Sequence, residues 1–354
     1  MGHISIECLR NNTIFKKLFK NIDSLILDIT IKWKEPHRYY HSLDNHLIPL
    51  FNLIQKLEVD GTLAKEDVEL LYIIAVFHDI VYKANLKNNE VESANLFKNL
   101  VGDRRCKEID IIYRAILSTK EYLNPRYRFT DLEMLFMNLD CDTLYNGSLN
   151  TLIDNEKLLF KEYQMFPYES YKSGRLEFLD NFKKTNTHRF PKGADVLSDY
   201  IDYIKTRIPR IGVYAGSFDP FHKGHKDILR KADMLFDKVV VAMGTNGDKS
   251  ANKYKYDTYL ELVESTYPRQ VDIYNGFLSD YIKKQEEFAD ITLIRGVRTG
   301  SDFDYEMNLY KFLQDMHSSI KVLWLPCNRE FEHLSSSAVR EIARINKNAV
   351  KQYI

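Results

Sequence analysis

The segment GSFDPFHKGH, residues 216–225, joins a short apolar run to a helical pattern and decides the fold of its part of the chain. The run IGVYAG before it predicts a β-strand. The stretch GHKDILRKADMLF after it predicts a helix with one apolar stripe, made of Ile228, Leu229, Ala232, Leu235 and Phe236. We therefore expect the first strand-to-helix turn of an open α/β fold. There the free N–H groups and the positive end of the helix dipole favour phosphate.

Two histidines, His222 and His225, add polar groups to the start of that helix. A polar cap on a buried helix would also explain a lone glycine turn. The combination of an HxGH pattern with an aspartate-proline pair is much rarer by chance. We therefore favour an anion-binding turn over a simple cap.

The rest of the chain predicts two domains. RIGVYAG, DKVVVAMG, DITLIRG and IKVLWLP are short runs rich in Val, Ile and Leu that alternate with helical patterns, which is typical of a parallel sheet with right-handed crossovers. Earlier segments such as EDVELLYIIAVFHDIVY and DLEMLFMNLDCDTLY carry apolar residues at helical spacing. We expect an all-α domain over residues 1–207 and an α/β, Rossmann-like domain over residues 208–354.

Composition excludes several classes of partner. The 354 residues include 50 acidic and 50 basic side chains, so no global field favours nucleic acid or an anionic membrane. The longest apolar run, LLYIIAVF, is too short to span a bilayer, and MGHISIECLRNN at the start has no signal-peptide core. The four cysteines lie far apart without a CxxC pair, which favours reduced thiols. We expect a soluble cytoplasmic protein.

Four ordered motifs in residues 210–345 resemble one enzyme family. GSFDPFHKGH resembles the signature of the HxGH nucleotidyltransferases. GFLSDYIKK (276–284), IRGVRTGSDFDYEMNL (294–309) and NREFEHLSSSAVREIA (328–343) follow in the order and spacing of phosphopantetheine adenylyltransferase. The resemblance implies transfer of AMP from ATP to 4′-phosphopantetheine, which gives dephospho-coenzyme A and pyrophosphate.

The resemblance also implies roles for individual residues. In-line attack by the substrate phosphate needs no covalent nucleophile, only two aligned anions and stabilised charge on the α-phosphate. His225 would stabilise that charge with His222 beside it, Lys249 would neutralise the pantetheine phosphate, and Arg295 and Arg298 would grip phosphates. Further binding residues would be Ser217 and Phe218 where the substrates meet, Phe277 and Leu278 along the pantetheine arm, and Gly296, Glu306, Phe331, Ser335, Ser336 and Ser337 around adenosine and pyrophosphate. Mg²⁺ is expected with ATP.

A second candidate site lies in the helical half. His78 and Asp79 fall in a strongly apolar segment, where a charged pair is costly unless something such as a bound cation compensates it. His41 and Asp140 lie in the helical segments before and after. Two histidines and two carboxylates suit a divalent ion such as Mn, Fe or Zn. A core histidine capped by its neighbouring aspartate, without a metal, is the alternative.

The segments HRYYHSLDNH, FHDIVY, NNEVESA and LDCDTLYNG are similar to the HD superfamily of metal-dependent phosphohydrolases, over about residues 25–206. This resemblance implies an HD-type helical bundle and a divalent metal held by His41, His78, Asp79 and Asp140. It also implies that Glu90 positions substrate or water, with Asp142 as a reserve ligand. A second histidine is expected four residues after His41, but Asn45 is there and His46 follows it. Tyr122 stands where another polar site residue is expected.

Together the two halves predict a bifunctional enzyme whose partners are ATP and a phosphorylated small-molecule acceptor, in a homo-oligomer. Two alternatives stay open. His222 stands where the adenylyltransferase family usually has threonine, so the acceptor could be another phosphate such as nicotinamide mononucleotide. The helical half could also be a non-catalytic regulatory domain.

Overall fold

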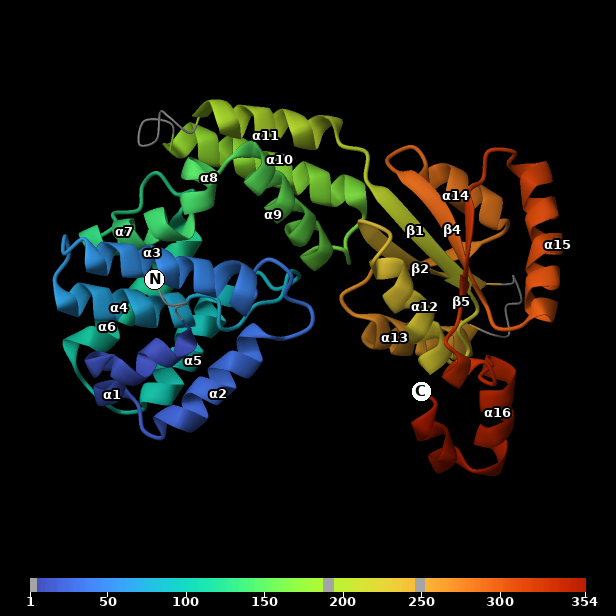
Figure 1. Cartoon of the computed structure of the whole chain (residues 1–354), viewed down its shortest axis with the longest axis horizontal. Coiled ribbons are helices and arrows are strands. Elements are labelled where there is room, and N and C mark those ends of the chain that lie inside the picture. Colours follow the sequence, from blue (N-terminus) through green and yellow to red (C-terminus); the bar gives the residue numbers. More distant parts are fainter. Residues whose placement is uncertain (1–4, 187–193, 246–251) are drawn as a thin grey trace. The chain divides into compact units, whose positions relative to one another are not determined.

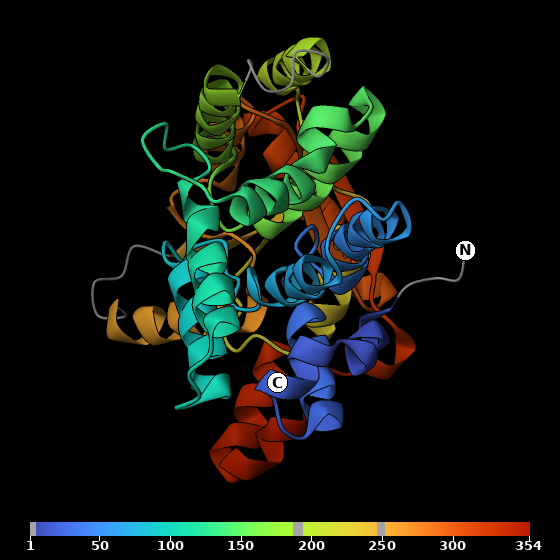
Figure 2. The same ribbon diagram turned by 90° about the vertical axis from the view of Figure 1, so that its left-hand side faces the viewer.

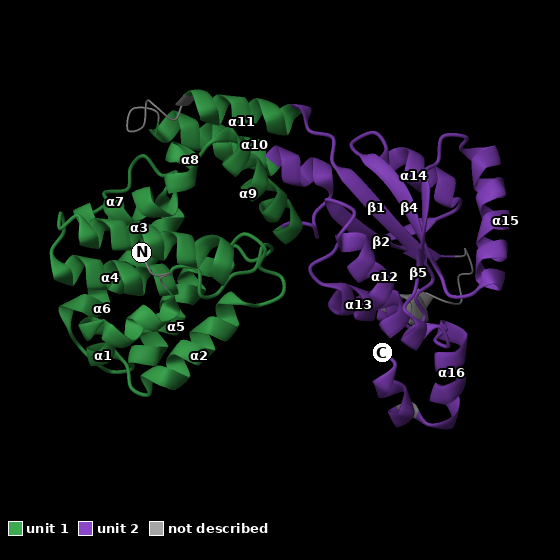
Figure 3. Ribbon diagram, viewed as in Figure 1, with its two compact units in different colours: residues 1–162, 174–205 green, residues 163–173, 206–354 purple. Residues whose placement is uncertain are grey.

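The computed structural model describes residues 5–186, 194–245 and 252–354 (Figure 1). Contacts within the chain separate two compact units, one of residues 1–162 and 174–205 and the other of residues 163–173 and 206–354 (Figure 3). The assignment of residues 1–207 and 208–354 as domains stays a prediction. Among the described residues, every helix is too short or too polar to cross a membrane.

The regular elements described in the first unit are all helical, as the sequence predicts. They are η1 (Ile6–Asn11), α1 (Thr13–Leu18), α2 (Ile22–Trp33), η2 (Leu43–Leu47), α3 (Ile48–Val59), α4 (Lys65–Phe77), α5 (Asn89–Val101), α6 (Lys107–Ser118), η3 (Thr119–Glu121), α7 (Asp131–Asp140), α8 (Asp142–Asn146), α9 (Leu149–Glu162), most of α10 (Tyr168–Asn186) and nearly all of α11 (Ala194–Thr206).

Helix α4 forms the centre of the first unit, next to α1, α3, α5, α6 and α7 (Figures 1 and 2). Every residue from Val68 to Phe77 is buried, because all of them except the hydrogen-bonded Glu69 are apolar, on every face of the helix. The helix ends at Phe77, so His78 follows directly at its buried end. Helix α7 begins with a capping box between Thr130 and Glu133 and ends at Asp140. The ends of these two helices position the candidate site of this unit.

The second unit contains a five-stranded parallel sheet in the order β3-β2-β1-β4-β5, as expected for an α/β fold. Its strands are β1 (Arg210–Gly216), β2 (Lys238–Thr245), β3 (Val271–Asn275), β4 (Asp290–Val297) and β5 (Val322–Pro326). Its remaining elements are α12 (Lys223–Asp233), α13 (Asn252–Thr266), α14 (Leu278–Gln285), α15 (Gly300–Met316), η5 (Arg329–Phe331), α16 (Ser336–Ile345) and η6 (Lys347–Gln352).

The strand order predicts where a ligand would bind in the second unit. The chain moves outward from β1 to β3 on one side, then returns to form β4 and β5 on the other side (Figure 1). In central β1, Val213 is fully buried and pairs with Val240 and Leu293. Open parallel sheets bind ligands outside the carboxyl ends of the strands where the order reverses, here between β1 and β4.

Candidate functional site

The turn after β1 has the conformation that the sequence predicts. Strand β1 ends at Gly216, and His222 is the N-cap of α12. Phe218 has φ 49°, a left-handed backbone that bulky residues rarely adopt, and its side chain is buried. The rings of Phe218 and His225 meet edge to face with centroids 5.2 Å apart. The ring of Phe218 therefore packs against His225 and lies in the hydrophobic core.

The two histidines of the turn are stacked, with ring centroids 3.7 Å apart. The backbone N–H of His222 donates to Nδ1 of His225 over 3.2 Å, so a neutral His225 carries its proton on Nε2. Burial, with a smaller contribution from Arg298, lowers the pKa of His222 to about 4. Burial, His222 and Arg298 lower the pKa of His225 well below 6.5. His225 is therefore a neutral N–H donor at neutral pH.

Of the two predicted phosphate-binding arginines, Arg295 lies within β4 and Arg298 directly follows it, and both are held by carboxylates. Arg295 donates from Nε to Glu306 over 2.5 Å and from Nη1 to the Ala215 carbonyl over 3.1 Å. Arg298 pairs with Asp302 through Nε and Nη2, at 2.8 and 3.0 Å. An arginine pair is usually solvated in a loop, but Arg295 is in a strand and both side chains are fixed by hydrogen bonds.

A pocket of about 330 Å³ lies at this crevice. Three helix starts contribute to it: His222 and His225 from α12, Asp302 from α15, and Ser335 and Ser336 from α16. Among the predicted site residues it brings together His222, His225, Gly296, Arg298, Glu306, Phe331, Ser335 and Ser336. Each helix start offers free N–H groups and a positive dipole end, so the pocket suits a polyanion.

Other predicted residues of this site lie outside the pocket lining. Ser217 is exposed, Ser337 accepts a hydrogen bond from Arg340, and Phe277 is 65% exposed at the start of α14, directly before Leu278. Lys249 lies outside the described residues. These positions leave the acceptor side of the site as a prediction.

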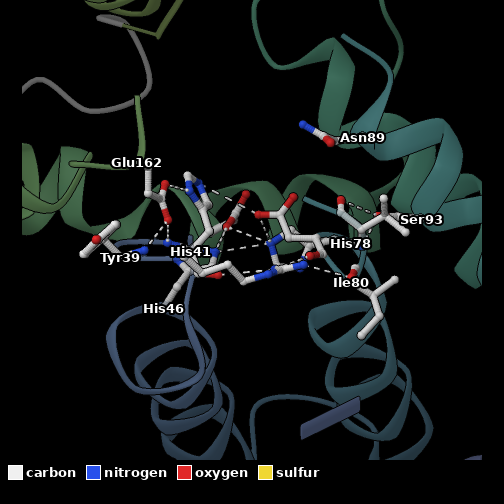
Figure 4. Close-up of polar contacts among 12 residues, drawn as sticks. Tyr39, His41, His46, His78, Ile80, Asn89, Ser93 and Glu162 are labelled. Atoms are coloured by element: carbon white, nitrogen blue, oxygen red, sulfur yellow. Dashed lines mark hydrogen bonds and ion pairs between the residues drawn. The ribbon is translucent and has the colours of Figure 1, made fainter. Parts of the chain in front are cut away.

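In the first unit, His46, His78 and Asp140 form a cluster whose candidate ligand atoms all lie within 4.8 Å of one another. Nε2 of His78 lies 3.2 Å from Nε2 of His46 and 3.5 Å from Oδ1 of Asp140. It also lies 3.3 Å from Oδ2 of Asp79. Burial alone would lower the pKa of His78, but Asp79 and Asp140 raise it well above 6.5. Figure 4 labels His46 and His78 among the polar contacts of this region.

The hydrogen bond of Nδ1, on the other side of the His78 ring, shows which ring nitrogen is available to bind a cation. Nδ1 of His78 is 2.8 Å from the Ala75 carbonyl, which can only accept, so Nδ1 carries the proton. In the neutral ring, the lone pair of Nε2 then faces the carboxylates of Asp79 and Asp140. Lone pairs that converge in a buried place repel unless a proton or cation lies between them. The donor set of two imidazoles and one carboxylate suits a divalent transition metal.

His46 is the residue that sequence reasoning left out of the ligand set. Residues Leu43–Leu47 form a π-helix, and the N–H of Leu47 donates to the Ser42 carbonyl, five residues back, over 3.2 Å. The wider turn absorbs the one extra residue that places His46, not Asn45, in the cluster. Only the exposed Asn45 at the expected position signalled this shift.

His41 and Asp79, two predicted ligands, lie beside the cluster and outside its closest group. Nε2 of His41 is 3.9 Å from Oδ2 of Asp79. The buried carboxylate of Glu162 accepts hydrogen bonds from Nδ1 of His41 at 2.7 Å and from the backbone N–H groups of His41 and Tyr39 at 2.7 and 2.9 Å (Figure 4). Glu162 thereby turns Nε2 of His41 towards Asp79. No sequence pattern linked Glu162 to His41, because 121 residues separate them.

The remaining predicted residues of the first unit divide into two groups. The Tyr122 hydroxyl is buried and faces Asp140 without a well-aligned hydrogen bond, and burial and Asp140 raise its pKa. It therefore lies at the cluster. Asp142 instead accepts a hydrogen bond from Asn146 within its own helix, and Glu90 is at the start of α5, outside the group of candidate ligands.

Comparison with known proteins identifies relatives of the second unit. A model of the family described as "Cytidylyltransferase-like" matches residues 213–342. A phosphopantetheine adenylyltransferase of Clostridium perfringens is 31% identical over 149 residues, which are 41% of this chain and 88% of that protein. One of Geobacter sulfurreducens is 34% identical over 140 residues, 39% of this chain and 84% of that protein.

A solved structure described as a nicotinate-nucleotide adenylyltransferase of Vibrio parahaemolyticus shares 16% identity over 39% of this chain and 82% of its own. Its TM-score of 0.26 is too low to support an inference. The sequence relatives do support one. Through its second unit, this chain belongs to the cytidylyltransferase-like family, with phosphopantetheine adenylyltransferases as its relatives.

Proposed function

We propose that the second unit transfers AMP from ATP to 4′-phosphopantetheine and releases pyrophosphate. The main support is the pocket in which three helix starts, Arg298 and a neutral His225 surround one space. The relatives named phosphopantetheine adenylyltransferase support the choice of acceptor. The exposed Phe277 and adjacent Leu278, which follow β3, suit the apolar pantetheine arm.

In this proposal, each residue of the pocket has its own role in an in-line displacement. The acceptor phosphate attacks the α-phosphorus of ATP, the bond to the β-phosphate breaks, and pyrophosphate leaves with its electron pair. Nε2–H of His225 donates to the oxygen on which negative charge grows. Arg298 and the N–H groups at the start of α16 hold the departing phosphates. Mg²⁺, when bound with ATP, would reduce the repulsion between the two anions.

The intact chain tests this proposal with ATP, Mg²⁺ and one acceptor at a time. We expect pyrophosphate and dephospho-coenzyme A with 4′-phosphopantetheine, and much slower release with nicotinamide mononucleotide. A preference for nicotinamide mononucleotide would reject the acceptor but keep the adenylyltransferase. No pyrophosphate with either acceptor would reject the function.

We propose a second activity for the first unit, metal-dependent hydrolysis of a phosphate ester. The supporting observation is the convergence of His46, His78 and Asp140 in a buried place, with the lone pair of His78 turned inward. These three residues would hold a divalent ion such as Mn, Fe or Zn, and Asp79 and His41 lie next to it. Such an ion, when bound, supplies a Lewis acid and lowers the pKa of water.

Metal analysis of the intact chain, followed by phosphate release from a set of phosphoesters, tests this activity. About one equivalent of metal with phosphate release supports the hydrolase. Bound metal without release from any ester favours a regulatory domain, and absence of metal rejects the hydrolase and leaves the non-catalytic regulatory domain. A cytoplasmic location and a homo-oligomer stay predictions.

A further inference from the structure

Asp302, like Glu306, places a negative charge in a pocket whose helix starts and Arg298 suit anions. It lines the same space as His225, Arg298 and Ser335. By charge alone, a carboxylate there opposes the binding of a triphosphate. Its presence therefore requires a compensating role.

The contacts of Asp302 are almost entirely with one partner. Oδ2 accepts from Nε of Arg298 at 2.8 Å and from the backbone N–H of Arg298 at 3.2 Å, and Oδ1 accepts from Nη2 at 3.0 Å. Two parallel hydrogen bonds between a carboxylate and a guanidinium fix both the distance and the plane of the cation. Nη1 of Arg298 also donates to the Leu334 carbonyl over 2.8 Å, directly before the serines that begin α16. Arg298 is thus held on two sides.

The remaining donors of Arg298 are those a phosphate would need. A guanidinium has five N–H bonds, of which Nε, Nη1 and Nη2 each use one in these contacts. One N–H on Nη1 and one on Nη2 remain, and no hydrogen bond joins them to the described residues. Two N–H groups in one plane match two oxygens of a phosphate.

We propose that Asp302 is a positioning residue that holds the Arg298 guanidinium in the plane from which these two N–H groups meet the transferring nucleotide beside His225. The inference rests on the proposed adenylyltransferase function of this pocket. Asp302 itself need not touch substrate. Its charge would cost some binding of ATP in the ground state, and the fixed arginine would recover more in the transition state.

The variant Asp302→Asn separates these two effects. Asparagine keeps one acceptor oxygen for the backbone N–H of Arg298 but loses the charge and the double hydrogen bond. We expect kcat to fall about tenfold or more, because the guanidinium is free to move. We expect KM for ATP to stay equal or to fall, because a negative charge has left the pocket. Loss of folding alone would not lower KM.

Asp304→Asn is the matched control, because Asp304 is an exposed carboxylate on the same helix, two residues further on. A non-hydrolysable ATP analogue, titrated into each full-length variant, checks that one site per chain still binds. In an Arg298→Lys background, Asp302→Asn should change kcat less than twofold, because lysine has no planar fork to position.

Three outcomes contradict the proposal. If Asp302→Asn behaves like Asp304→Asn, Asp302 does not position Arg298. If additional Mg²⁺ restores its kcat, Asp302 serves the cation instead. If the wild-type chain releases no pyrophosphate, the proposed function fails and this inference fails with it, whereas an active wild type with an unaffected variant rejects only the inference.

Discussion

The two candidate sites of this chain both bring histidines together, but the groups around them have opposite charge. In the second unit, burial, with Arg298 nearby, lowers the pKa of His222 and His225. In the first unit, Asp79 and Asp140 raise the pKa of His78, although burial opposes them. The first arrangement keeps neutral N–H donors for an anion, and the second concentrates negative charge for a cation. The neighbours of each ring therefore decide which kind of ligand the site suits.

The largest effect is expected from removal of His225 in the anion-binding pocket. His225→Ala should lower turnover by a factor on the order of 10²–10³, because it removes a donor to the oxygen that gains charge in the transition state. ATP binding should change little. Rates of pyrophosphate release and titration with a non-hydrolysable ATP analogue measure both quantities.

The control for that variant is His333→Ala, which removes an exposed histidine of the same unit. It should keep wild-type turnover. Near-normal turnover in His225→Ala would remove His225 from the mechanism.

The next largest effect is expected on metal binding at the cluster of His46, His78 and Asp140. His46→Ala should weaken the binding of Mn²⁺ or Zn²⁺ about 100-fold or more, because it removes one of three clustered donors. His41→Ala should weaken it less, because His41 lies outside the closest group. Metal titration of the full-length variants gives the two affinities, and pyrophosphate release with wild-type rates shows that the fold is intact. A larger effect from His41→Ala would reverse the assignment of ligands.

A third effect is expected on the pH dependence of stability, through His222. The pKa of His222 is about 4 in the folded chain, compared with 6.5 for an ordinary histidine, so the unfolded chain binds more protons between these values. The free energy of unfolding should therefore fall as the pH drops from about 6.5 towards 4, by up to on the order of 3 kcal/mol from this residue.

Urea unfolding of wild type and His222→Asn at several pH values measures this contribution. The variant should lose less stability in acid than wild type does, and His333→Asn should follow wild type. Identical slopes for wild type and His222→Asn would show that the pKa of His222 is not lowered.

The smallest effect concerns a hydroxyl at the cation site. Tyr122→Phe should change the free energy of unfolding by no more than about 0.5 kcal/mol, because the buried hydroxyl faces Asp140 without a well-aligned hydrogen bond. Tyr200→Phe should cost about 1–2 kcal/mol, because its hydroxyl donates to Glu156 over 2.6 Å. Urea unfolding of metal-free protein compares them. An equal cost for both would mean that Tyr122 also has a structural partner.

The sheet of the second unit was predictable where its strands form continuous apolar runs. β1, β2, β4 and β5 appear in the sequence as apolar runs, followed by glycine or proline. Strand β3 was not predicted, because its residues, VDIYN, mix polar and apolar side chains and are half exposed to exposed. The other edge strand, β5, was predicted because VLWLP is a continuous apolar run.

The candidate sites show the same limit at the level of side chains. His222 and His225 lie within one turn of helix, so their proximity followed from the local pattern alone. His46 was left out because the regular spacing of an α-helix does not include the π-helix of Leu43–Leu47. Glu162 was missed because its contact with His41 depends on how two distant segments pack.

Four apolar strands that alternate with helices, the strand-to-helix turn at residues 216–225 and the apolar helix that ends beside His78 could be predicted from local sequence, because each depends on neighbours within a few residues. The order of the strands in the sheet and the side chains that share each pocket depend on the packing of distant segments. This packing brought Arg298 against Asp302 and Leu334, and His78 against His46 and Asp140. Charge and hydrogen bonding act over a few ångströms in space, whatever the separation along the chain.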